Sequence, residues 1–169
     1  MDRGVVVDSN VMNLFNQGVI EDETTDARQL VEKIEATHGF AIDAGGKIRQ
    51  QWLETCDSVY FGTWFTEGLK TGRIHQVAPT ISQADAKHLR ITCGMPRARF
   101  EFTYVAVANR VTQPRYIVTE DIDFWEPKAK TASHERKEAI KATRTGCVCK
   151  HLGQMGIAVG TVAQGLVDL

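Results

Sequence analysis

The sequence contains little that marks a membrane-bound, secreted or disulfide-rich protein. Only 4 of its 169 residues are cysteines and 4 are prolines, and no run of about 18 apolar residues is long enough to cross a bilayer. The N-terminal region lacks the apolar stretch and small-residue cleavage site of a secretory signal. Few cysteines in such a chain predict reduced thiols. Together these absences predict a cytoplasmic protein with no membrane partner.

An excess of positive charge is also missing. Twenty Lys and Arg residues face 21 Asp and Glu residues, for a net charge of -1, and this balance argues against a strongly basic nucleic-acid binder. The 43% hydrophobic and 24% charged residues are typical of a soluble globular domain. No Pro/Ser-rich linker divides the chain and no GxxxxGK[ST] loop is present. We expect one domain over residues 1–169.

Short apolar runs alternate with longer segments of helical periodicity. The apolar runs predict strands at residues 5–7, 40–42, 116–119 and 157–159. The periodic segments predict helices at residues 22–38, about 99–108 and from 133, one or two helices at 47–69, and a short helix or tail at 161–169. This alternation predicts an α/β fold with a mostly parallel central sheet and helices on both faces.

Two of the predicted strands end in acidic residues. Asp8 follows the first strand, and Asp121 and Asp123 follow the third. Ligands of open parallel sheets bind beyond the carboxyl ends of the strands, so neighbouring strands would bring these carboxylates together. Adjacent carboxylates stay ionised with a cation between them, and oxygen ligands suit Mg²⁺ or Mn²⁺. The alternative is that these residues cap helices or form turns.

Three segments, in this order along the chain, resemble the motifs of the PIN-domain nuclease family. They are VVVDSNVM at residues 5–12, EFTYVAVA at 101–108 and IVTEDIDF at 117–124. The family usually has Asp where this chain has Glu101. The resemblance implies a PIN-like α/β/α sandwich and a metal-dependent endonuclease that hydrolyses phosphodiester bonds, with RNA as its substrate ahead of DNA.

The resemblance also implies roles for particular residues. Asp8, Glu101, Asp121 and Asp123 would be the catalytic and metal-binding residues, holding Mg²⁺ or Mn²⁺ to polarise the phosphate and activate water. Thr119 would hydrogen-bond a ligand carboxylate or an incoming phosphate. Asn10 would cap the first helix or support the site. Single-domain PIN proteins are often toxins or defence effectors, so the implied partners include an antitoxin or other protein and a second copy of the chain.

The chain departs from the family at a second acidic position. Where a PIN-like variant has Glu before an aromatic residue, this chain has Gln51. An amide oxygen coordinates without charge, so Asp43, or in second place Glu54, is the expected substitute ligand. The alternative is a degenerate PIN-like module that binds nucleic acid or regulates without catalysis. A phosphatase with Asp8 as nucleophile is a third hypothesis, but it usually needs Asp at the position of Asn10.

Positive charge gathers in residues 126–151, where seven Lys and Arg residues outnumber three Glu residues to give +4. Lys128, Lys130, Arg136 and Lys137 are candidate phosphate contacts, with Arg97 and Arg99 in support. A solvated helix face is the alternative. Trp64 and Trp125 would stack on unpaired bases if exposed, although core packing is the commoner use of tryptophan.

The segment CVCKH at residues 147–151 has the residue types of a zinc site. The sequence shows no second pair of cysteines or histidines at zinc-finger spacing, so four ligands are not in evidence. We therefore expect Cys147 and Cys149 to be buried free thiols.

Overall fold

The computed structural model of the protein describes residues 2–96 and 101–169. Within these residues, five parallel strands form two small sheets. One sheet has the order β1-β4-β5, with strands at Val6–Val7, Tyr116–Val118 and Ala158–Gly160. The other pairs β2 (Phe40–Asp43) with β3 (Ile74–Val77). A parallel bridge from Val5 to Phe40 joins them, so the strands follow the spatial order β3-β2-β1-β4-β5.

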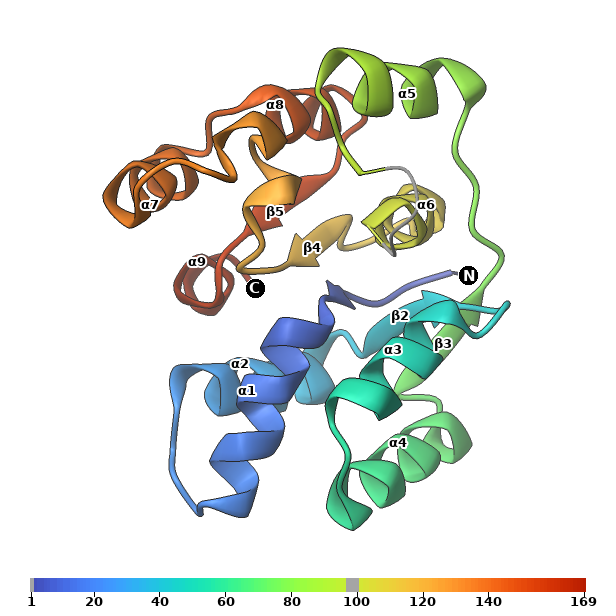
Figure 1. The fold of residues 1–169 in the computed structure, drawn as a ribbon. Helices are drawn as coiled ribbons and strands as arrows, with labels where there is room; N and C mark the ends of the chain where they lie inside the picture. Colours follow the sequence, from blue (N-terminus) through green and yellow to red (C-terminus); the bar gives the residue numbers. More distant parts are fainter. Residues whose placement is uncertain (1, 97–100) are drawn as a thin grey trace.

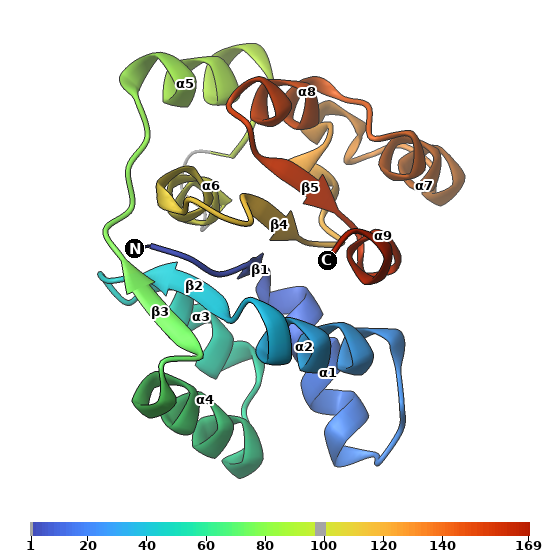
Figure 2. The same ribbon diagram turned by 180° about the vertical axis from the view of Figure 1, so that it is seen from behind.

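Helices connect the strands and cover both sides of them. They are α1 (Ser9–Ile20), α2 (Asp26–Thr37), α3 (Lys47–Thr55), α4 (Val59–Thr71), α5 (Gln83–Lys87), α6 (Glu101–Arg110), α7 (His134–Thr143), α8 (Cys147–Gln154) and α9 (Val162–Asp168). A π-helix, η1 (His88–Thr92), and two 3₁₀ turns, η2 (Ile122–Phe124) and η3 (Pro127–Ala129), lie between them. Helices α1 and α3 face the viewer in Figure 1, and α2 and α9 do so in Figure 2.

The core forms where the apolar runs of the sequence meet. Val5, Val6 and Val7 are fully buried, as expected for a β-branched strand covered on both faces. Helix α2 buries Leu30 among its apolar residues at helical spacing. A side chain at Gly165 of α9 would meet the Leu30 side chain at 3.0 Å, so the glycine lets α9 pack closely on α2.

The order of the strands places one crevice at the middle of the fold. From β1 the chain runs outward to β2 and β3, and it then returns through α6 to β4 on the other side of β1. Loops that leave β1 and β4 therefore diverge in opposite directions. At such a point in a parallel sheet a crevice opens outside the carboxyl ends of the strands.

The structure confirms an α/β fold with parallel strands and all four predicted strands. It adds β3, which the sequence hides because polar His75 and Gln76 occupy the middle of this edge strand. It also adds α8. Of the one or two helices predicted at residues 47–69 it shows two, α3 and α4, and α4 begins after the capping residue Ser58. The expected helix start near Arg99, and Arg97, lie outside the described residues.

The prediction that the cysteines are reduced is wrong for two of the four. Cys93, after η1, and Cys147, at the start of α8, are disulfide-bonded. Their separation of 54 residues explains why local spacing gave no sign of the pair. Cys56 is a buried free thiol, whereas Cys149 is free but half-buried, so the expected burial of Cys149 is wrong. In the described part of the chain, no helix has the length and apolar character needed to span a membrane.

Gly4 lies at the junction of the two sheets, and its substitution tests how closely the segments of the chain pack there. Its φ is +118°, and a Cβ there would stand 2.6 Å from the carbonyl carbon of Phe40. We expect Gly4→Ala to lower the free energy of unfolding by about 2–4 kcal/mol, through backbone strain and overpacking. Gly62→Ala is the matched control. Gly62 lies within α4 with no atom within 4 Å of a built Cβ, so this change should raise stability by about 0.5–1 kcal/mol. Equal effects in urea unfolding would contradict the account.

Candidate metal centre

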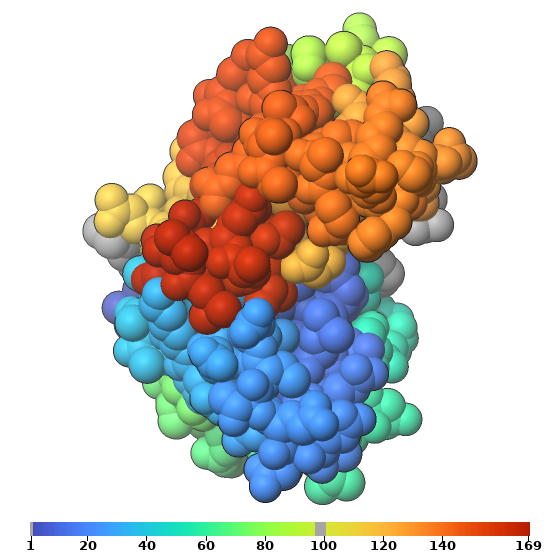
Figure 3. Space-filling view, turned by 90° about the vertical axis from the view of Figure 1, so that its left-hand side faces the viewer, coloured from blue at the N-terminus to red at the C-terminus, as the bar shows by residue number. Residues whose placement is uncertain are grey.

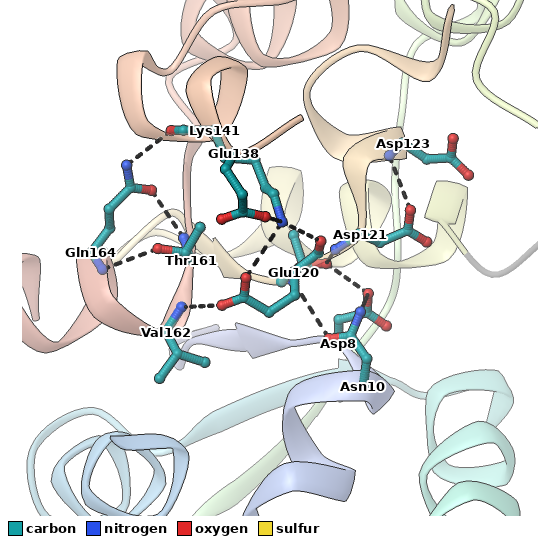
Figure 4. Close-up of polar contacts among 11 residues, drawn as sticks. Asp8, Asn10, Glu120, Asp121, Asp123, Glu138, Lys141, Thr161, Val162 and Gln164 are labelled. Atoms are coloured by element: carbon teal, nitrogen blue, oxygen red, sulfur yellow. Dashed lines mark hydrogen bonds and ion pairs between the residues drawn. The ribbon is translucent and has the colours of Figure 1, made fainter. Parts of the chain in front are cut away.

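Three carboxylates from two distant parts of the chain meet at the crevice. Glu101 is the first residue of α6, Asp121 precedes η2, and Asp123 lies within it. One oxygen from each lies within 4.8 Å of the others. Figure 4 shows Asp121 and Asp123 side by side above Asp8. The structure thus brings together the three residues that the sequence motifs had placed at separate positions.

Asp8 joins this group because β1 pairs with β4. Val7 lies opposite Val118, and the Asp8 N–H donates to the Val118 carbonyl at 2.9 Å. The buried Thr119 hydroxyl donates to Asp8 Oδ2 at 2.7 Å and accepts from the Asp121 N–H at 3.0 Å. Thr119 therefore holds the Asp8 carboxylate and the Asp121 loop in one arrangement, as the resemblance had implied for a supporting residue.

The side chain of Asp8 does not serve as a helix cap. It occupies the N-cap position of α1, yet it makes no cap hydrogen bond to the helix backbone. Its oxygens accept instead from the Asn10 amide at 3.1 Å and the Ser9 hydroxyl at 3.4 Å. Asn10 also accepts from the Glu120 N–H at 3.5 Å. Asn10 thus orients Asp8, whereas Asp121 does cap η2, through the Asp123 N–H at 3.0 Å.

Gln51 reaches the centre through a tyrosine. Its side-chain oxygen accepts a hydrogen bond from the Tyr104 hydroxyl. Burial raises the pKa of Tyr104, and the charge of nearby Asp8 adds to this increase. Gln51 is therefore a hydrogen-bond partner of Tyr104, whose hydroxyl is close enough to Asp8 for the charge of Asp8 to affect its pKa.

Asp43 has a structural role in this fold. Its two carboxylate oxygens accept from the backbone N–H groups of Lys47, at 2.9 Å, and Ile48, at 2.7 Å. Both oxygens therefore cap the N-terminus of α3. Among the described residues, Asp43 does not join the carboxylates that cluster within 4.8 Å. Glu54, the second substitute, is exposed and accepts from Gln50 at 2.8 Å.

The centre holds several carboxylates, but few hydrogen-bond donors or cations pair with their oxygens. Asp123 is fully buried, and one oxygen pairs with Lys130 Nζ at 3.0 Å. The other Asp123 oxygen and Glu101 Oε2 are buried without a hydrogen-bond partner in the described structure. Burial, followed by the neighbouring carboxylates, raises the pKa of Glu101, and burial raises the pKa of Asp8 to about 6. Unpaired carboxylate oxygens in one place fit a hard divalent cation such as Mg²⁺ or Mn²⁺.

Of the four predicted phosphate contacts, two bind other groups of the protein and two lie on α7. Lys130 belongs to the carboxylate centre, and Lys128 donates to the Thr92 carbonyl at 3.1 Å. Arg136 is exposed and Lys137 half-buried on α7, in the orange segment that lies above α1 and α2 in Figure 3.

Three other residues, one lysine of the basic segment and the two tryptophans considered for base stacking, are internal. Lys141 is buried between Glu120 and Glu138, at 3.6 and 2.8 Å (Figure 4). It also lies over the buried Trp125 ring. Trp64 is buried as well, so both tryptophans belong to the core.

Comparisons with models of protein families, with curated proteins and with solved structures found no match for this chain. The function of the protein must therefore be inferred from the residues of the carboxylate centre and their geometry.

The raised pKa of Asp8 predicts an unusual dependence of stability on pH. Because this pKa rises from 3.8 to about 6 on folding, the folded chain keeps a proton that the unfolded chain loses between about pH 4 and 6. This contribution to stability is fully present below about pH 4 and is lost, by about 3 kcal/mol, as pH rises through 6. Asp8→Asn should remove this loss and stabilise the metal-free protein at about pH 7.5.

The free energy of unfolding of each variant is measured by urea unfolding in the presence of a chelator, at about pH 4 and about pH 7.5. Asp22→Asn is the control, because Asp22 is 98% exposed in its side chain and its positive φ suits Asn. The same pH profile for Asp8→Asn and the parent protein would contradict the assignment.

Proposed function

We propose that the protein is a metal-dependent endonuclease with a PIN-like site, and that its substrate is RNA. The observation that carries this proposal is the cluster of Glu101, Asp121 and Asp123 beside Asp8, with two buried oxygens that have no partner in the described residues. The position of this cluster at the carboxyl ends of β1 and β4 supports it, because ligands of parallel sheets bind there. The resemblance in three ordered motifs favours RNA over DNA.

In this proposal Asp8, Glu101, Asp121 and Asp123 hold Mg²⁺ or Mn²⁺. The bound ion would polarise the scissile phosphate and lower the pKa of the attacking water. Thr119 and Asn10 fix the orientation of the Asp8 carboxylate through their hydrogen bonds. Lys130, whose side chain is 47% exposed, is free to turn from Asp123 to a substrate phosphate once a cation neutralises the carboxylates.

Arg136 and Lys137 of α7 would contact the phosphates of the RNA backbone. The net charge of the whole chain, -1, hides this positive charge because several acidic residues lie at the carboxylate centre. On α7 itself Glu138 pairs with the buried Lys141 at 2.8 Å, and Glu135 is exposed. Arg136 is exposed and Lys137 is half-buried. A role as a toxin or defence effector, with an antitoxin or a second copy of the chain as partner, is the biological setting that the resemblance favours.

A second candidate is a PIN-like module that binds nucleic acid without cleaving it. Lys130 favours this candidate, because its ammonium group already compensates the charge of Asp123. Gln51 favours it too, since its amide bonds Tyr104 and adds no charge to the centre. The two candidates differ in whether the carboxylates bind a divalent cation and support hydrolysis.

Cleavage of single-stranded RNA separates the candidates. With Mn²⁺ or Mg²⁺ present, we expect the parent protein to cleave internally, and Asp8→Asn and Asp121→Asn to lower the rate about 100-fold or more through loss of a metal ligand. Asp22→Asn should cleave as the parent does, and chelation should stop the reaction. A parent protein that binds RNA and neither cleaves it nor takes up Mn²⁺ in calorimetry would establish the module instead. Equal cleavage by all variants would place the chemistry elsewhere.

These two residues of α7 have a separate test in the salt dependence of RNA binding. The double variant Arg136→Ala/Lys137→Ala, made in the Asp8→Asn background to prevent cleavage, should bind labelled single-stranded RNA more weakly. The slope of log K against log salt should fall by about 1.4, since each phosphate contact to a single strand contributes about 0.7. Lys70→Ala, an exposed change on α4, is the control. An unchanged slope in fluorescence anisotropy would exclude Arg136 and Lys137 as phosphate contacts.

A further inference from the structure

A second group of ligand-type side chains lies between η1 and α8, apart from the carboxylates. One nitrogen of His88 and the sulfurs of Cys93 and Cys147 all lie within 4.8 Å of one another. Soft sulfur and imidazole nitrogen are the ligands that zinc prefers. His88 and Cys93 are close in the sequence, but Cys147 follows Cys93 by 54 residues, so the fold brings the third residue to the other two.

The π-helix η1 sets the position of the first two ligands. The Cys93 N–H donates to the His88 carbonyl at 3.1 Å, an i to i+5 bond that places Cys93 one wide turn after His88. Single π-turns of this kind are rare in proteins and are frequent at functional sites. The local backbone therefore presents a histidine and a cysteine to the same partner, α8.

Helix α8 presents a matching pair. Cys147 and His151 are four residues apart and share one face of the helix. The His151 ring stacks on the His88 ring at a centroid distance of 4.2 Å. Its Nε2 lies 2.9 Å from Asp85 Oδ1, and its Nδ1 is buried with no partner among the described atoms. When Nε2–H donates to the carboxylate, the lone pair of Nδ1 is available to a ligand.

We propose that the reduced protein binds one Zn²⁺ through Cys93, Cys147, His88 and His151. Two thiolates and two imidazoles make a closed tetrahedral set, which is typical of structural zinc. Asp85 is then the carboxylate that orients a zinc-bound histidine from behind, as zinc sites commonly require. Zinc bonds of about 2.0–2.3 Å place tetrahedral ligands about 3–4 Å apart. His88, Cys93 and Cys147 already lie within 4.8 Å of one another, and His151, stacked on His88, would turn its Nδ1 toward them as the fourth ligand.

Zinc binding and the disulfide are alternative states of the same two cysteines. A dithiol reductant supplies two electrons and two protons, so the Cys93–Cys147 bond breaks, two thiols form, and the reductant becomes a cyclic disulfide. Zn²⁺ then displaces the two thiol protons and binds both thiolates. Either state fastens η1 to α8, the disulfide in an oxidising setting and zinc in a reducing one.

This fastening lies next to the loop that carries the carboxylates. The N–H groups of Val148 and Cys149 donate to the Trp125 carbonyl at 3.0 and 3.3 Å, and the Cys147 N–H donates to Glu126 Oε2 at 3.1 Å. The start of α8 thus holds the chain just after Asp123. A link between η1 and α8 in both redox states keeps this loop attached.

Cobalt spectroscopy tests the site, because thiolate-to-cobalt absorption reports sulfur ligation and does not arise at a carboxylate centre. The full chain is reduced with dithiothreitol and freed of it by anaerobic gel filtration, and its thiols are counted. We expect one equivalent of Co²⁺ to give this absorption with tetrahedral ligand-field bands, and Zn²⁺ to abolish both. The oxidised protein should give neither. A reduced protein with all thiols free and no such absorption would overturn the proposal.

Histidine variants test the ligand set without removing the disulfide. His88→Gln and His151→Gln keep both cysteines, so circular dichroism of their oxidised forms checks that they fold. In the reduced state each should bind Zn²⁺ at least about 10- to 100-fold more weakly, as measured by competition with a chromophoric chelator. His134→Gln, an exposed change on α7, should bind as the parent does. Unchanged affinity in either ligand variant would overturn the four-ligand site.

Discussion

The parallel pairing of β1 with β4 is the constraint on which the carboxylate centre depends. Val6 and Val7 lie opposite Ile117 and Val118, and this register sets the two strand ends level with each other. Thr119 continues the pairing beyond the strands through its contacts with Asp8 and Asp121. A shift of one residue would turn every side chain to the other face and separate these groups. Buried valines therefore fix the geometry of polar side chains that have no packing reason to meet.

The buried carboxylates lower the free energy of unfolding, and the other interactions of the fold must compensate for this loss. Burial and mutual repulsion raise the pKa values of Asp8 and Glu101, so the ionised centre destabilises the fold at neutral pH. Such a cost is typical of functional sites and not of cores. Lys130 relieves it in part by pairing with Asp123. A divalent cation would relieve the remainder, which is why the same residues that weaken the apoprotein suit a metal centre.

The sequence predicted the parts of this arrangement that local pattern encodes. The alternation of short apolar runs and helical segments predicted the fold class and four strands. Acidic residues after two of the strands predicted that Asp8, Asp121 and Asp123 meet, whereas Glu101 came from the resemblance. The sequence could not distinguish Asp43 from a ligand, since both uses place Asp after a strand, and only the contacts with Lys47 and Ile48 reveal a cap. The pairing of Cys93 with Cys147 was equally hidden, because it depends on how η1 packs against α8.

The central claim is that the carboxylates at the ends of β1 and β4 form a cation site. A crystal structure of the parent protein grown with Mn²⁺, with anomalous diffraction recorded at the manganese edge, tests it most directly. The account predicts an anomalous peak bounded by Glu101, Asp121 and Asp123, with Lys130 withdrawn from Asp123. A crystal saturated with Mn²⁺ that shows no peak there, and in which Lys130 still pairs with Asp123, would contradict it.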